Sequence, residues 1–326
     1  TTKAANPTAV AAFINAAKKG GNIAVGQYSS AVGTANIASG WLSSAVGYGN
    51  AASNLYSNAL GSNNTASNLY SNALGSNNNA LGLSSSSVGL GNLTTQFASS
   101  AFGFSNAAVA ESSTAMGSGI SGGVSSRLRT LEEKVENGKL VSVNGVAVTA
   151  TGNTTATITH VNGVAVDENQ KSQFLNILRQ GNVAAGQYSS AMGVRNLATG
   201  VDSSAFGYGN DASGSNSSAV GFENTASNGD LNNAFGAYNK NNGAAKNTAV
   251  GIGNIINSSA WGTNALGYSN NVSNLYGSAI GTKNTVTVVG GNAIGLNNIV
   301  TGGYANAIGT GNTVIGQNGA AVGSGL

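Results

Sequence analysis

Residues 292–309 read NAIGLNNIVTGGYANAIG, so the tetrapeptide Asn-Ala-Ile-Gly begins at Asn292 and again at Asn306, 14 residues later. The unit Ala-Φ-Gly, in which Φ is a large apolar residue, recurs through residues 31–117 in steps of 14 and through residues 191–323 in steps of 14 to 16. Asn stands three residues after the Gly in 15 of these 17 repeats. A fixed short period predicts a solenoid in which each repeat forms one coil.

The repeat also predicts how one coil is built. Fourteen residues divide into two extended stretches of about five residues, with one bend centred on Gly and one on Asn, because both residues tolerate positive φ. Side chains alternate between the two faces of a strand. The residue before Φ is Ala in 16 of the 17 repeats, so we expect it to face a narrow interior between two sheets. The predicted fold class is therefore an all-β parallel β-roll with 14-residue coils.

The Φ residues are too large for that interior and would form an apolar stripe along each array. Monomers rarely expose apolar patches beyond a few hundred Å². An interior lined by Ala also buries too little apolar surface to offset the ordering of the backbone. We therefore expect the stripe to be covered by self-association. Its members are Val32, Val46, Leu60, Leu74, Val88, Phe102, Met116, Met192, Phe206, Val220, Phe235, Val250, Leu266, Ile280, Ile294, Ile308 and Val322.

The repeat, seen in Asn292-Ala293-Ile294-Gly295 and Ser30-Ala31-Val32-Gly33, resembles the YadA-like heads of the trimeric autotransporter adhesins. This resemblance implies a left-handed parallel β-roll and a homotrimer with the 17 Φ residues in its shared core. It also implies a place on the bacterial cell surface, with an outer-membrane anchor in a region outside this stretch. The implied partner is an extracellular matrix protein or another ligand on a cell surface.

The arrays define a domain organisation. We expect a capping helix over residues 1–20, a first β-roll over 21–123, a connector over 124–180 and a second β-roll over 181–326. Residues 21–53 match residues 181–213 at an offset of 160, which indicates duplication. A helix is expected over 168–180 and, like the first, is expected to cap an open coil.

The connector contains two further patterns. Val124, Leu128, Leu131 and Val135 follow the apolar spacing of a coiled coil and predict a short trimeric helix. After it, the Asn-Gly pairs at 144–145 and 162–163 lie between strand-like stretches and predict two β-hairpins.

Composition argues against several classes of function. The chain has 13 basic and 10 acidic residues and no Cys, so it lacks a basic patch for nucleic acid and thiolates for zinc. His160 is the only histidine, and Glu132, Glu133 and Glu136 are expected on a solvated face. No run of 18 apolar residues is present, so we expect no membrane insertion by this segment. We expect no catalytic residues, no cofactor and no metal, and hence no enzyme.

Aromatic residues are the remaining candidates for ligand contact. Five of them directly follow a repeat Gly, and we expect them at exposed bends: Tyr48, Phe104, Tyr208, Phe222 and Tyr268. Tyr is favoured at interfaces. The alternative is that these rings stack on neighbouring coils and only stabilise the roll.

Three functions remain open. The first is an adhesin head that mediates attachment through many weak contacts along a trimeric rod. The second is a segment of a phage tail fibre or extracellular filament, acting as a structural spacer. The third is an ice-binding solenoid, which the irregular placement of Thr disfavours.

Overall fold

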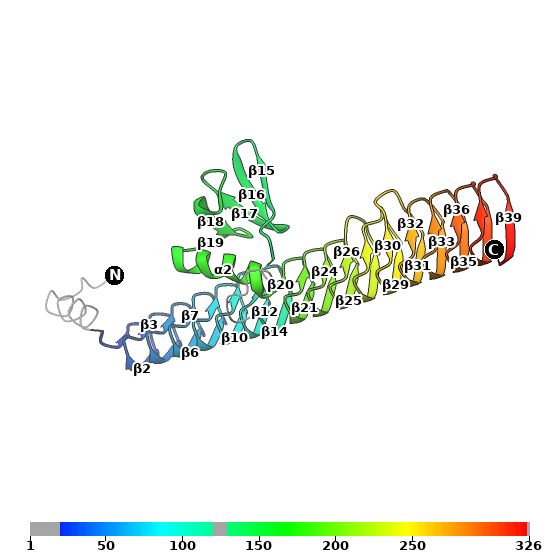
Figure 1. The fold of residues 1–326 in the computed structure, drawn as a ribbon. Coiled ribbons are helices and arrows are strands. Elements are labelled where there is room, and N and C mark those ends of the chain that lie inside the picture. The colour runs from blue at the N-terminus through cyan, green and yellow to red at the C-terminus, as the bar shows by residue number, and fades with distance from the viewer. Residues whose placement is uncertain (1–19, 120–128, 325–326) are drawn as a thin grey trace. The chain divides into compact units, whose positions relative to one another are not determined.

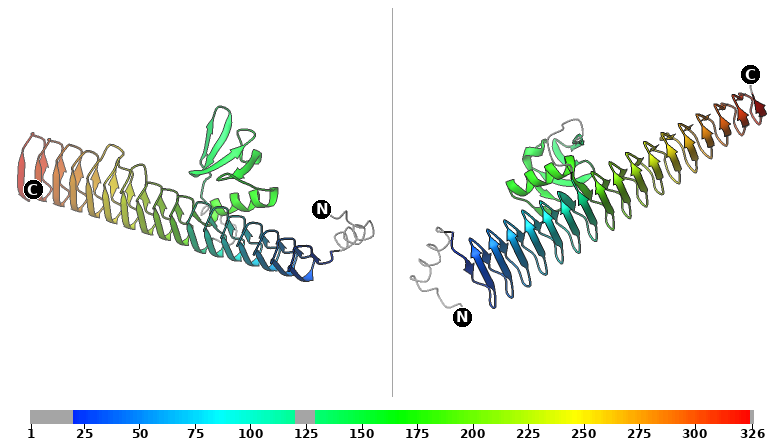
Figure 2. Two further views of the ribbon diagram at one scale, coloured as in Figure 1. Left: turned by 180° about the vertical axis from the view of Figure 1, so that it is seen from behind. Right: turned by 60° about the horizontal axis from the view of Figure 1, so that its bottom comes forward.

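The computed structural model describes residues 20–119 and 129–324, which belong to two units, residues 1–183 and residues 184–326 (Figure 1). Each unit contains a parallel β-solenoid of stacked coils of about 14 residues, as the period predicts. In each solenoid the long strands form one sheet and the short strands form the other (Figure 2). The capping helix predicted over residues 1–20 lies outside the described residues.

The solenoid of unit 1 alternates short and long strands. The long strands are β2 (Ser30–Thr34), β4 (Ser44–Tyr48), β6 (Asn58–Ser62), β8 (Asn72–Ser76), β10 (Ser86–Leu90), β12 (Ser100–Phe104) and β14 (Thr114–Ser118). The short strands are β1 (Ile23–Ala24), β3 (Ile37–Ala38), β5 (Ala51–Ala52), β7 (Thr65–Ala66), β9 (Asn79–Ala80), β11 (Leu93–Thr94) and β13 (Asn106–Ala108).

Unit 2 repeats this alternation. Its long strands are β21 (Ser190–Val194), β23 (Ser204–Tyr208), β25 (Ser218–Phe222), β27 (Asn233–Ala237), β29 (Thr248–Ile252), β31 (Asn264–Tyr268), β33 (Ser278–Thr282), β35 (Asn292–Leu296), β37 (Asn306–Thr310) and β39 (Ala320–Ser324). Its short strands are β22 (Leu197–Ala198), β24 (Asp211–Ala212), β26 (Thr225–Ala226), β28 (Lys240–Asn241), β30 (Ile255–Ile256), β32 (Asn271–Val272), β34 (Thr285–Val286), β36 (Ile299–Val300) and β38 (Thr313–Val314).

Successive coils are in register. Val32 pairs with Val46, and Val46 with Leu60, so equivalent repeat positions form straight columns. The longer repeats of unit 2 keep this register, since Phe235 pairs with Val250 across a step of 15. The additional residues lie in the turns between a short strand and the next long strand, as between β28 and β29. Insertions are therefore absorbed outside both sheets.

The prediction of two five-residue strands per coil is wrong for the second strand, which has only two or three residues. The repeat Gly is also not at a bend. Gly61 lies inside β6 with φ 116°, and a Cβ there would be 2.0 Å from the carbonyl oxygen of Gly75 in the next coil. This column requires glycine because the coils approach each other too closely for any side chain.

The repeat Asn differs from its prediction as well. Positive φ belongs to the residue before it, as in Asn63 (54°), whereas Asn64 is fully buried. The Asn64 side chain Nδ2 donates to the Oδ1 of Asn50 at 2.9 Å and to the carbonyl oxygens of Leu60 (2.9 Å) and Gly75 (2.8 Å). Its own Oδ1 accepts from Asn78 Nδ2 at 3.0 Å. The repeat Asn residues thus form an internal amide ladder that satisfies buried polar groups between coils.

Between β14 and residue 168, unit 1 contains a small antiparallel sheet. Its strands are β15 (Glu133–Glu136), β16 (Lys139–Val143), β17 (Val146–Ala150), β18 (Ile158–Val161) and β19 (Val164–Ala165), with a 3₁₀ turn η2 (Thr155–Thr157) before β18. The hairpins predicted at 144–145 and 162–163 are confirmed, because Val143 pairs with Val146 and Val161 with Val164.

The coiled-coil prediction over this connector is wrong at its C-terminal end. Val135 lies in strand β15, where Glu136 pairs with Lys139 of β16. Asn137 (φ 50°) and Gly138 (φ 74°) form the turn between these strands. An Asn-Gly turn of this kind favours a hairpin and interrupts a helix. Residues 124 and 128 of the heptad pattern lie outside the described residues.

Helix α2 (Glu168–Gln180) spans the range predicted from the sequence. Asp167 caps it, accepting from the backbone N–H of Gln170 at 2.8 Å while the Gln170 side chain accepts from Asp167 N–H. Its buried Phe174, Ile177 and Leu178 form an apolar face. The helix lies along β11 and β13, on the outer side of the short-strand sheet of unit 1. The helix therefore covers the side of the roll. The prediction that it caps an open coil is wrong.

The chain returns to the roll directly after α2. The Asn182 Nδ2 donates to the Oδ1 of Asn106 at 2.8 Å, although 76 residues separate them in sequence. The amide ladder of unit 1 therefore continues past the connector. Strand β20 (Asn182–Ala184) follows, and the connector is an insertion between two consecutive rungs of the ladder.

Candidate functional site

The outer face of the long-strand sheet carries the Φ stripe. In β35, Ala293 is completely buried whereas Ile294 next to it is 40% exposed. The same alternation holds along each array, because equivalent residues pair directly, as Ile280 does with Ile294 and Ile294 with Ile308. Each unit therefore presents a column of exposed or half-buried apolar side chains on this face. The 17 predicted Φ residues all belong to these two columns.

The five aromatic candidates lie on the same face. Each is the last residue of a long strand, so the prediction that they lie at bends is wrong. Residues two apart in a strand point to the same side, so Tyr48 shares its face with Val46. Tyr48 and Tyr268 are exposed and Tyr208 is half-buried. Self-association through the Φ stripe and ligand contact through these rings would therefore compete for neighbouring surface.

Two of these aromatics are brought together. The rings of Tyr208 and Phe222, paired across β23 and β25, stack at 5.0 Å with an interplanar angle of 8°. The Arg195 guanidinium lies 5.8 Å from the Tyr208 ring and 3.8 Å from a carboxylate oxygen of Glu223. This stacking fits the alternative that these rings stabilise neighbouring coils.

A second set of aromatic residues lies at the turns that lead into some of the long strands. Tyr56 and Tyr70 both have positive φ and stack at 5.1 Å. In unit 2, the ring of Trp261 meets that of Tyr276 edge-on at 5.1 Å, and the Lys246 ammonium lies over Trp261. Tyr at positive φ is uncommon. The threefold occurrence of Ser-Asn-Leu-Tyr is the sequence signal for this turn.

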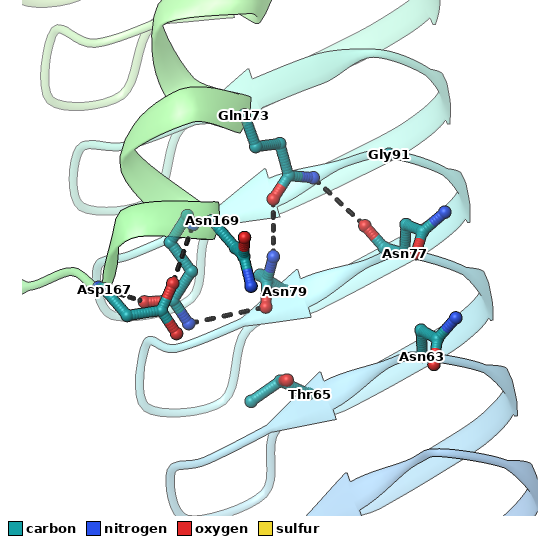
Figure 3. A pocket seen from close by; sticks show the side chains of 9 residues that line it. Asn63, Thr65, Asn77, Asn79, Gly91, Asp167, Asn169 and Gln173 are labelled. Atoms are coloured by element: carbon teal, nitrogen blue, oxygen red, sulfur yellow. Dashed lines mark hydrogen bonds between the residues drawn. The ribbon is translucent and has the colours of Figure 1, made fainter.

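A polar pocket of about 550 Å³ opens between the N-terminal turn of α2 and the coils of unit 1 (Figure 3). Sequence analysis did not anticipate it, because its two walls are about 100 residues apart in the chain. The lining residues are Asn63, Thr65, Asn77, Asn79, Gly91, Asp167, Asn169, Gln170 and Gln173. The sequence contains no motif for this pocket, since Asn and Thr are frequent throughout both arrays.

The residues weighed for catalysis lie apart from this pocket. His160 is in β18, with its Nδ1 2.9 Å from the hydroxyl of the adjacent Thr159. Glu136 pairs with Lys134 at 2.7 Å on the exposed β15 hairpin. Within residues 20–119 and 129–324, no three side chains of the His, Cys, Asp and Glu types gather as metal ligands would. No helix in that part of the chain has the length and apolar composition needed to cross a bilayer.

Comparison with known proteins yields no family assignment: no family model matches the chain, and no curated protein matches it.

Proposed function

We propose that this chain is a head segment of a trimeric autotransporter adhesin, a left-handed β-roll that forms a homotrimer through its Φ stripes. In this proposal it acts at the bacterial cell surface and attaches the cell to extracellular matrix, host cells or other cells. Its role is binding rather than catalysis.

The exposed apolar stripe is the observation that carries the proposal. Ala293 and its equivalents fill the interior, so large residues such as Ile294 find no place there and remain on the surface of a single chain. Such a continuous column of apolar side chains is typical of a surface that a partner covers. A second copy of the same chain offers a column with the same spacing, which favours self-association.

Stacked coils also support a multivalent mode of attachment. Equivalent side chains recur once per coil, so any weak contact made by one coil is available again on its neighbours and on each further chain. Linked weak sites raise the overall avidity far above the affinity of one site. The five aromatics at the long-strand ends then border the buried stripe, and their role in ligand contact stays a prediction.

Sedimentation equilibrium of the whole chain and of two matched variants tests the proposal. Ile294→Asp places a charge in the Φ stripe, whereas Ile299→Asp places one on the short-strand face of the same solenoid. The two side chains are 40% and 42% exposed, so the variants differ mainly in the sheet they alter. We expect the wild type and Ile299→Asp at three times the monomer mass and Ile294→Asp shifted towards monomer.

The same samples are then tested on immobilised collagen, fibronectin and laminin and on whole cells. We expect attachment to be lost together with the trimer in Ile294→Asp, because avidity depends on several chains. A wild-type chain that is monomeric at micromolar concentration would contradict the proposal. A trimer that attaches to none of these surfaces would instead favour the spacer function.

A further inference from the structure

We infer that the polar pocket beside the N-terminal turn of α2 binds a neutral carbohydrate. The inference rests on the proposed attachment function in naming its ligand class, although the pocket itself is formed within one chain. Four features of the pocket support it: the chemistry of its lining, the way its walls are held, its place on the roll and the residues at equivalent positions.

The lining is rich in side-chain amides. Six of its nine residues are Asn or Gln, and Thr65 adds a hydroxyl. An amide presents a donor and an acceptor side by side, which matches the neighbouring hydroxyl groups of a sugar. No Lys, Arg or His is among the lining residues, so nothing there would neutralise a phosphate or sulfate. The volume of about 550 Å³ is within the range of small-molecule sites.

Some of these amides hold the helix against the roll. The Gln173 Nε2 donates to the carbonyl oxygen of Asn77 at 3.0 Å, and its Oε1 accepts from Asn79 (Figure 3). The same Nε2 also donates to the carbonyl oxygen of Asn92 at 3.2 Å. Gln170 Nε2 reaches Asn79 Oδ1 at 3.4 Å. These bonds connect α2 to two coils, so contacts within the chain itself hold one wall of the pocket in place.

Other lining groups are not used by the fold. Within the described residues, the side-chain amides of Asn63, Asn77 and Asn169 and the hydroxyl of Thr65 take part in none of the hydrogen bonds that hold unit 1 together. They come from both walls, two bends and a strand of the roll on one side and the first turn of α2 on the other. A ligand in the pocket can therefore bond to both walls without displacing an existing contact.

The strand residues of the pocket and the Φ stripe lie on different sheets. Thr65 and Asn79 point outward from the short-strand sheet, because Ala66 and Ala80 next to them are fully buried in the interior. The Φ stripe belongs to the outer face of the opposite, long-strand sheet. Contacts through the stripe therefore do not involve Thr65 and Asn79, whereas Asn63 and Asn77 lie at the bends between the two sheets.

Equivalent positions show that the roll does not require this composition. The bend position of Asn63 and Asn77 is occupied by Ala35 and Ser105 in other coils of unit 1, with similar φ values of 56°. In the short-strand column of Thr65 and Asn79, the next coil has Leu93, which is fully buried beside α2. The side-chain amides and the hydroxyl are thus concentrated in the part of the roll where α2 does not cover the short-strand column.

Titration of the whole chain with uncharged and charged saccharides tests the inference. The probes are neutral disaccharides of hexose and N-acetylhexosamine, with sialyllactose and a sulfated heparin disaccharide as charged probes. Binding is followed by saturation-transfer NMR and calorimetry. The variant Asn63→Gly/Asn77→Gly removes two amides while keeping residues suited to positive φ. Asn297→Gly is the matched control, because Asn297 has φ 53° at the same bend position in unit 2.

We expect a neutral disaccharide to bind the wild type and the control equally, and the double variant roughly tenfold more weakly, since about two hydrogen bonds are lost. Asn169→Ala, which alters the opposite wall, should weaken binding by a smaller factor. Equal binding by the double variant, preference for the charged probes, or no binding of neutral probes at millimolar concentration would each overturn the inference.

These outcomes are separable from those of the proposed function. A chain that sediments as a monomer but binds saccharide through Asn63 and Asn77 would contradict the trimeric head and leave the pocket intact. A trimer whose attachment to cells is the same in the double variant and in the wild type would leave the adhesin proposal standing without this site.

Discussion

The early coils of unit 1 and the last coils of unit 2 fill the same interior in two ways. In unit 1 the inward position of the short strand is Ala, as at Ala52 and Ala66, and a buried Ser lies across from it. Ser57 is one of these, with its Oγ 2.6 Å from the carbonyl oxygen of Asn54. In the last coils of unit 2 the inward position is Val, as at Val286 and Val300, and the Ser position holds Gly or Ala.

The exchange conserves volume. A Cβ added to Gly291 would lie 2.9 Å from Val288, 3.0 Å from Val300 and 3.1 Å from Val286. The larger Val thus occupies the space that the missing side chain leaves. Cores tolerate substitution when total volume is kept. The coil dimensions are therefore set elsewhere, by the Gly column and the Asn ladder that both regions share.

In the longer coils of unit 2, part of the interior is polar, at Asn232, Asn241, Asn247 and Thr263. Asn247 Nδ2 donates to Asn232 Oδ1 at 3.0 Å, and Thr263 Oγ1 donates to Asn247 Oδ1 at 2.8 Å. Asn241 fills the inward short-strand position and donates to the carbonyl oxygen of Asn247 at 2.8 Å. A second polar ladder therefore replaces the Ser in the longer coils, and Asn241 replaces the apolar short-strand residue in one of them. The same backbone accommodates a third way of filling its core.

The largest expected effect is at the Gly column, which both regions share. Gly61→Ala and Gly295→Ala should each destabilise the chain by more than about 4 kcal/mol, because Cβ would lie 2.0 to 2.1 Å from the carbonyl oxygen of the next coil. Urea unfolding measures the loss. Gly91→Ala is the control: it has positive φ but nothing within 4 Å, so about 1 kcal/mol is expected. Similar losses at Gly61 and Gly91 would refute the steric explanation.

The second-largest loss of stability is expected at the Asn ladder. Asn64→Ala in unit 1 and Asn284→Ala in unit 2 each leave buried carbonyl oxygens and a neighbouring amide without a partner, which costs about 2 to 3 kcal/mol. We expect equal losses in the two regions by urea unfolding, since the bond lengths are alike: Asn64 to Gly75 O and Asn284 to Gly295 O are both 2.8 Å. A loss confined to one region would show that the ladder is not the common scaffold.

The smallest expected loss of stability concerns the two ways of filling the interior, with Ala and Ser or with Val and Gly. Gly291→Ser should destabilise unit 2 by about 1 to 3 kcal/mol through overpacking. Combining it with Val300→Ala should recover much of this loss, because the pair then has the Ser and Ala of unit 1. A double-mutant cycle measures the coupling. Additive losses, with no recovery in the pair, would mean that the two positions are filled independently.

The sequence predicts the coil period because the columns of a solenoid repeat it directly. Ala beside Φ also indicates which side chains face inward, as Ala293 and Ile294 illustrate. The role of Asn could not be read in the same way. Asn suits both a bend with positive φ and a buried ladder, and only the burial of Asn64 beside the bend residue Asn63 distinguishes these roles.

The connector shows where a local pattern misleads. The apolar spacing that ends at Val135 predicts a helix, but Asn137-Gly138 forms a turn and the segment pairs with β16. Two heptads stabilise a helix only weakly, so the antiparallel partner decides the outcome. The same stretch contains two further Asn-Gly turns, so the pair Asn137-Gly138 is itself a sequence signal for the third hairpin.

The coil length, the inward Ala column, the outward Φ stripe and the extent of α2 can all be predicted from the sequence, since each depends on spacing or on neighbours in the chain. Three features follow only from the packed structure: α2 lies along the roll, Asn182 follows Asn106 in the ladder, and a polar pocket opens beside Asn169. These features join residues about 80 to 100 positions apart. Such contacts are set by how surfaces pack, and no periodic pattern in one segment records them.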